Sequence, residues 1–197
     1  MRKPNRLFWF TKGIPMSKLP TVRLTLCALF AALLAICAQL VIPLGPVPLS
    51  LALLAVLLCG GLLPAPWAAL SVAAYLLLGL CGVPVFAGFR SGPQTLLGLT
   101  GGYLLGYLPA AVLTALLGRR GPWWRLPLAM LVGVAACYAL GTVWFMVCWT
   151  AQKGAGISLS AALSMCVWPF LPGDALKIAL AALLVRRLRG PLRLTRK

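Results

Sequence analysis

Apolar runs of about 15 to 24 residues recur along the chain and are separated by short breaks rich in Gly and Pro. A helix needs about 20 mostly apolar residues to cross a bilayer, so each run predicts one membrane-spanning helix. The predicted fold class is all-α: a polytopic membrane protein built as a six-transmembrane-helix bundle. The predicted helices cover residues 22–42, 49–63, 66–80, 96–117, 126–150 and 172–189. Residues 157–167 are expected to form a separate amphipathic or capping segment.

The composition excludes a water-soluble globular domain. Hydrophobic residues make up 62% of the 197 residues, charged residues make up 10%, and the mean hydropathy is +1.00. Soluble domains usually carry about 25% charged residues, so this chain has too few polar side chains to cover a surface in water. We expect one transmembrane domain over residues 21–190, a basic cytoplasmic extension over 1–20 and a basic tail over 191–197. Met16 is a possible second start site.

The net charge of +17 comes from basic residues that cluster at the ends of the predicted helices. Fifteen of the 18 Lys and Arg residues lie before or at the start of the first helix, between the fourth and fifth, or at the end of the sixth and beyond it. Because cytoplasmic loops are enriched in Lys and Arg, this pattern predicts that both termini are cytoplasmic. The charges therefore need no nucleic-acid partner, and attraction to anionic lipid is their expected effect.

The titratable side chains restrict the possible chemistry. Asp174 is the single acidic residue and histidine is absent, which excludes paired-carboxylate catalysis, Ser-His-Asp triads and His/Asp/Glu metal sites. The phosphate-binding pattern Gly-x-x-x-x-Gly-Lys-Ser/Thr is also absent, so the chain does not hydrolyse ATP by that route. The seven cysteines form no Cys-x-x-Cys pair and are interpreted as small hydrophobic residues, with a thiolate metal site as the alternative. We expect no enzyme activity and no cofactor.

Two charged residues fall inside the last apolar run. Pro172 suits the first turn of a helix, which places Asp174 near the positive end of the helix dipole. The spacing of three brings Lys177 to the same helix face. Charges within a bilayer usually mark a ligand or ion path, so we interpret the pair as a binding site. The alternative is an ion pair that only fixes helix packing.

Arg90 lies in a Gly-rich outer loop that spans residues 82–93. An arginine there can bind an anionic group if the loop folds over a site. A solvated loop arginine is the equally open alternative.

Glycines recur every four residues at Gly98, Gly102 and Gly106, beside Gly101 and Tyr103. This spacing lets helix backbones approach closely, and helix packing is the favoured interpretation. The alternative is a ligand that lies against bare backbone, with the Tyr103 ring in the pocket wall.

Small residues on the first predicted helix form two faces with four-residue spacing. One face contains Ala28 and Ala32, and the other contains Ala31 and Ala35. Packing inside the bundle and docking to another subunit both suit such faces.

Four segments occur in the order found in a known family. They are Gly45-Pro46-Val47-Pro48, Tyr75 to Gly88, Thr100-Gly101-Gly102-Tyr103-Leu104, and Pro169 to Lys177. In these segments the chain resembles BioY, the biotin-specific substrate-binding subunit of energy-coupling factor (ECF) transporters. Departures are Ser50 and Ala52, where members often carry Thr and Gln, and Leu99, where they often carry Pro.

The resemblance implies a six-helix bundle that captures biotin and does no chemistry. Its expected partners are biotin, membrane lipid, a coupling transmembrane (T) subunit and two ATPase subunits, and its expected location is the cytoplasmic membrane. Given the resemblance, subunit docking becomes the favoured role of the Ala28 and Ala32 face. The residues expected to bind biotin are Asp174, Lys177, Arg90, Tyr75, Phe86, Gly101, Gly102 and Tyr103.

Several alternatives remain open at this level. The same architecture suits a substrate-binding subunit for another vitamin, or a solitary biotin transporter that works without ATPases. An intramembrane enzyme and a structural scaffold are further alternatives from other classes of protein.

Overall fold

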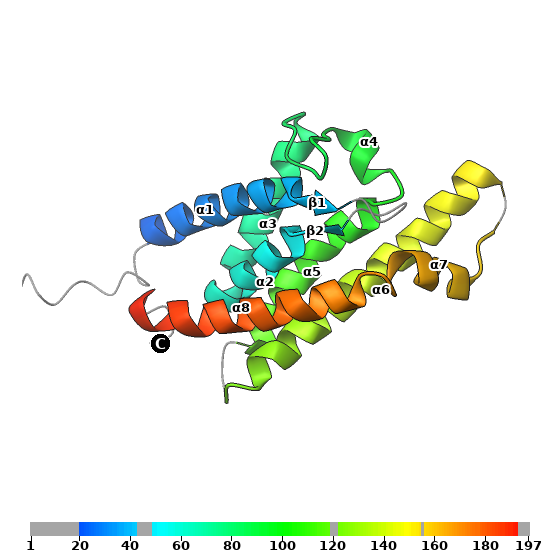
Figure 1. The fold of residues 1–197 in the computed structure, drawn as a ribbon. Coiled ribbons are helices and arrows are strands. Elements are labelled where there is room, and N and C mark those ends of the chain that lie inside the picture. The colour runs from blue at the N-terminus through cyan, green and yellow to red at the C-terminus, as the bar shows by residue number, and fades with distance from the viewer. Residues whose placement is uncertain (1–19, 43–48, 119–121, 155, 193–197) are drawn as a thin grey trace, which may run out of the picture.

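The computed structural model describes residues 20–42, 49–118, 122–154 and 156–192. These residues form a bundle of helices with one pair of two-residue strands (Figure 1). In chain order the elements are α1 (Pro20–Gln39), β1 (Val41–Ile42), β2 (Leu49–Ser50), α2 (Ala52–Leu62), α3 (Ala65–Leu80), α4 (Pro93–Leu96), α5 (Gly101–Gly118), α6 (Arg125–Lys153), α7 (Leu159–Cys166) and α8 (Leu171–Leu192).

Three described helices are long and apolar enough to cross a membrane, namely α1, α5 and α6. The helices α7 and α8 pass the same test together, although a bend of 53° separates them. The apolar helices α2 and α3 are shorter, with 11 and 16 residues. At 1.5 Å per residue, α2 is only about 16 Å long, about half of the hydrocarbon core of a bilayer.

The first predicted boundary is wrong by a few residues. We expected the first helix to reach residue 42, but α1 ends at Gln39 and the chain continues as β1. Val41 pairs with Ser50 of the antiparallel strand β2, so the second helix starts at Ala52 rather than at residue 49. The residue before a proline avoids the helical region, and Pro43 follows β1 directly. The predicted motif at residues 45–48 lies outside the described residues.

The fourth predicted helix begins five residues later than expected, at Gly101 of α5. Residues 97–100 separate the one-turn helix α4 from α5, where a single helix over 96–117 was expected. The turn is tight, because a Cβ on Gly101 would lie 1.6 Å from the Leu96 carbonyl oxygen. Other boundaries agree closely with the prediction: α8 begins at Leu171, and α7 is a separate segment before it.

Helix α2 lies at the centre of the bundle, between α1 and α8, and also packs on α5 (Figure 1). Helices α5 and α6 pack along a line of glycines. A Cβ on Gly102 would lie 2.2 Å from the Trp144 Cβ, and one on Gly106 would lie 2.9 Å from the Cys137 Sγ. Gly102 and Gly106 thus serve the helix packing that their spacing predicts.

Basic residues hold one end of the bundle together, where α2 and α5 end and α6 begins. Arg189 of α8 donates hydrogen bonds to the carbonyl oxygen of Gly61 (Nη2 to O, 2.8 Å) and to that of Gly118 (3.1 Å). The Arg186 guanidinium lies 5.5 Å from the centre of the Trp123 ring. We call this the basic end. Its predicted charges at Arg119, Arg120 and beyond residue 192 lie outside the described residues, as do those before residue 20.

The two small-residue faces of α1 differ in exposure. Ala31 is buried in the bundle core, whereas Ala28 and Ala32 are exposed. The exposed pair leaves one face of α1 unpartnered within the described chain.

Candidate ligand-binding site

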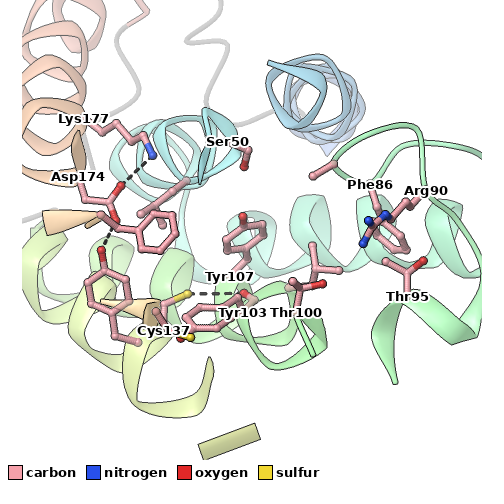
Figure 2. Close-up of a pocket in the computed structure, with 16 residues that line it drawn as sticks. Ser50, Phe86, Arg90, Thr95, Thr100, Tyr103, Tyr107, Cys137, Asp174 and Lys177 are labelled. Carbon is pink, nitrogen blue, oxygen red and sulfur yellow. Dashed lines mark hydrogen bonds and ion pairs between the residues drawn. The ribbon is translucent and has the colours of Figure 1, made fainter. Parts of the chain in front are cut away.

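A cavity opens between α5, α6, α8 and the loop that follows α3 (Figure 2). It contains about 720 Å³ of space when the solvent at its open mouth is included. Its walls are formed by Ser50, Leu53, Phe86, Ala87, Arg90, Thr95, Thr100, Tyr103, Leu104, Tyr107, Cys137, Tyr138, Cys166, Phe170, Asp174 and Lys177.

The charged pair on α8 forms one end of the cavity. Lys177 Nζ lies 2.7 Å from Asp174 Oδ1, and both side chains are at least nine-tenths buried. The Tyr138 hydroxyl of α6 donates a hydrogen bond to the other carboxylate oxygen, Oδ2. Burial of two charges is favourable only when each is well paired, and here the carboxylate has a partner on both oxygens. Each oxygen keeps a further lone pair for a ligand donor.

Arg90 lies at the opposite end of the cavity, beside Thr95 (Figure 2). Its side chain is exposed, and the guanidinium has no hydrogen bond or ion pair to any residue that the structure describes. The backbone of Arg90 forms two hydrogen bonds with Phe86, at 3.0 and 3.3 Å, across a narrow turn. An unpaired guanidinium at a cavity mouth suits a carboxylate or another anion.

Aromatic side chains line the space between the two charged ends. Tyr103 and Tyr107 extend from successive turns of α5, and Phe170 precedes α8. The Tyr103 hydroxyl is within 3.3 Å of Thr142 Oγ1, which fixes the ring orientation. The cavity therefore combines an apolar middle with polar groups at two ends, as small-molecule sites commonly do.

Three of the residues expected to bind ligand do not line the cavity. Tyr75 is fully buried behind Phe86, with the two ring centres 5.6 Å apart and edge to face. Gly101 and Gly102 are buried against Leu96 and α6, respectively. Asp174, Lys177, Arg90, Phe86 and Tyr103 all line it.

Sequence reasoning missed several lining residues, and Tyr138 is the most important. It lies in the middle of an apolar run, where one tyrosine gives no signal of its own. Tyr107 had a signal, because it follows Tyr103 by four residues and so shares its helix face. The described residues contain no group of three or more His, Cys, Asp or Glu that would hold a metal ion.

The BioY family model matches residues 11–193. The chain is 36% identical over 166 residues to a probable biotin transporter BioY of Pyrococcus horikoshii, covering 84% of this chain and 95% of that protein. It is 37% identical over 162 residues to a biotin transporter BioY of Thermotoga maritima, covering 82% of this chain and 92% of that protein. The chain belongs to the BioY family.

A solved structure supports the same assignment to BioY. The crystal structure at 2.1 Å of the S-component for biotin from an ECF-type ABC transporter matches with a TM-score of 0.77 and 31% sequence identity. The match covers 86% of this chain and 92% of that one. The relatives are transporters, and the long apolar helices identify this BioY family member as a membrane protein.

Proposed function

We propose that this chain captures biotin and imports it across the cytoplasmic membrane, as the substrate-specific subunit of an ECF-type importer. The observation that carries the proposal is the cavity with a buried Asp174–Lys177 pair at one end and, at the other, Arg90, whose guanidinium pairs with none of the described residues. It occurs in a chain of the BioY family, whose relatives are named biotin transporters.

The chemistry of biotin complements this arrangement. Its ureido ring offers N–H donors and a polar carbonyl, which suit the carboxylate of Asp174 and the ammonium of Lys177. Its thiophane ring and aliphatic tail suit the apolar middle, beside Phe86 and Tyr103. The tail carboxylate then reaches toward Arg90, because biotin is polar at both ends and so is the cavity.

The position of the basic end supports a direction of entry for the substrate. Asp174 and Arg189 are separated by about 22 Å along α8, so the cavity lies far from that end of the bundle. With the basic end in the cytoplasm, the cavity mouth faces outward and receives substrate from outside. The proposed topology has six spans, with α2 and α3 as short spans, α7 and α8 as one bent span and both termini inside. We also propose a multi-pass location in the cytoplasmic membrane.

Energy would come from other subunits. The chain lacks an ATP-binding loop, and the exposed Ala28 and Ala32 of α1 offer a face where a coupling T subunit can approach closely. Two ATPase subunits would complete the importer. This division of labour leaves the present chain with capture and presentation of substrate and no catalysis.

Uptake of radiolabelled biotin tests this function. Cells without their own biotin transporter should accumulate biotin when they express this chain with coupling and ATPase subunits. Uptake at the same rate without those subunits would instead support a solitary transporter. Competition by unlabelled biotin, and by no other heterocyclic vitamin, is the expected result. Competition by another vitamin at lower concentration would overturn the choice of ligand.

A further inference from the structure

Gln39, the last residue of α1, ties that helix to the loop that carries Arg90. Its Nε2 donates hydrogen bonds to the carbonyl oxygens of Pro84 (3.3 Å) and Phe86 (3.2 Å). Its Oε1 accepts a hydrogen bond from the Phe89 backbone N–H at 2.9 Å. Both ends of one carboxamide are therefore used, and all three contacts go to a segment more than 40 residues away in the sequence.

The loop holds a conformation that its own residues disfavour. Phe89 has a φ of +57°, in the left-handed region that residues with a Cβ seldom adopt. Its side chain is 72% exposed, so packing of the ring does not hold the backbone in place. The hydrogen bond from its N–H to Gln39 stabilises this strained turn, together with the two backbone hydrogen bonds between Phe86 and Arg90.

Other contacts fix the base of the loop but not its tip. The Phe86 ring packs on the bare backbone of Gly79 and against Tyr75. The Gly92 N–H donates to the Gly79 carbonyl oxygen at 2.7 Å. Between these points, two backbone hydrogen bonds join Phe86 to Arg90. The position of the turn therefore determines the position of Arg90.

We propose that Gln39 is a positioning residue for ligand capture, which holds the turn over residues 86–90 so that Arg90 meets the anionic end of the ligand. Gln39 itself does not line the cavity and acts through the loop. The proposal deepens the proposed function, on which it rests for the identity of the ligand as biotin.

The first test compares biotin with biotinamide, whose tail is neutral, in equilibrium binding to purified protein. Gln39→Met keeps the length of the side chain and removes its hydrogen bonds. We expect biotin affinity to fall by about tenfold or more, and biotinamide affinity to change by less than threefold. Equal losses for both ligands, or no loss for either, would overturn the proposal. Gln152→Met, an exposed glutamine near the end of α6, is the matched control and should leave both affinities unchanged.

The second test uses the strain at Phe89. Glycine adopts a positive φ without strain, so Phe89→Gly should let the turn form with less help from Gln39. We expect Gln39→Met to weaken biotin binding less in the Phe89→Gly background than in the unaltered chain. An undiminished effect in that background would contradict the role assigned to the strained turn.

Hydrogen exchange separates this inference from the ligand assignment, because it needs no ligand. The backbone amides of Phe89 and Arg90 should exchange several-fold faster in Gln39→Met than in the wild type, at equal thermal stability. If the wild type does not bind biotin, the proposed function fails and the exchange rates still test Gln39. Unchanged exchange at these amides would overturn the positioning role even if biotin binds.

Discussion

Tyr138 of α6 donates its hydroxyl hydrogen bond to Oδ2 of Asp174 on α8. Since Lys177 holds Oδ1, the carboxylate is fixed from two helices at once. A carboxylate held by two partners in this way keeps its direction inside an apolar bundle. The three side chains therefore form a single polar unit, which is already oriented before a ligand arrives.

Tyr138→Phe should weaken biotin binding by about 10- to 100-fold, because the Asp174 carboxylate loses a hydrogen bond of about 1.5–3 kcal/mol that orients it, and ligand binding must then supply that ordering. Isothermal titration calorimetry on protein in nanodiscs measures this change. Tyr75→Phe is the matched control, because the Tyr75 hydroxyl is buried without a hydrogen-bond partner among the described residues. Equal effects of the two substitutions would contradict the role of Tyr138.

Arg90→Ala should lower the affinity for biotin by about tenfold or more and change the affinity for biotinamide little, because only biotin carries the anionic tail. Competition binding with both compounds provides the measurement. Arg187→Ala removes an exposed arginine of α8 outside the cavity and should change neither affinity. An equal loss for both compounds would show that Arg90 does not recognise the carboxylate.

Gly102→Ala should destabilise the protein by about 1–3 kcal/mol, because its Cβ would lie 2.2 Å from the Trp144 Cβ and 3.0 Å from the Leu140 carbonyl oxygen. Thermal unfolding in detergent reports the change. Gly156→Ala is the control, since a Cβ there would meet nothing within 4 Å. A melting temperature for Gly102→Ala equal to that of the control would contradict the packing role of the glycine.

Ala28→Trp and Ala32→Trp should prevent assembly with the T subunit and leave biotin binding by the isolated chain intact, because a bulky ring blocks close helix approach. Co-purification with tagged T and ATPase subunits measures assembly. Leu131→Trp adds a similar ring on the exposed side of α6 and should not impair assembly. Normal assembly of both alanine variants would place the docking face elsewhere.

Much of the helical arrangement could be predicted because apolar runs and Gly/Pro breaks are local signals. The α8 boundary and the separate α7 follow from Pro172 and from the polar residues around it. The early end of α1 could not be predicted, because strand pairing between Val41 and Ser50 depends on two segments that meet only in the fold. The break at residues 97–100 could not be predicted either, because these residues continue the apolar run and the hydrophobic pattern therefore predicts one helix through them.

The charged part of the candidate site could be predicted from the sequence. Asp174 and Lys177 are conspicuous because few charges fall inside the apolar runs. The contribution of Tyr138 depends on how α6 packs beside α8, and that of Gln39 depends on a loop about 45 residues away. Tyr75 is a residue that the sequence placed in the site and the structure does not. It lies on a helix beside the site but faces the core, because the rotation of a helix decides which of its sides lines a cavity.

Equilibrium binding of radiolabelled biotin to the purified chain in nanodiscs is the most direct test of the central claim. The wild type should bind biotin tightly, and Asp174→Asn and Lys177→Ala should each lose at least 100-fold in affinity, since loss of one partner leaves the other polar group poorly paired. Lys153→Ala, an exposed lysine of α6, should bind like the wild type. No biotin binding by a wild type with a cooperative unfolding transition would contradict the account, as would unchanged affinity in both site variants.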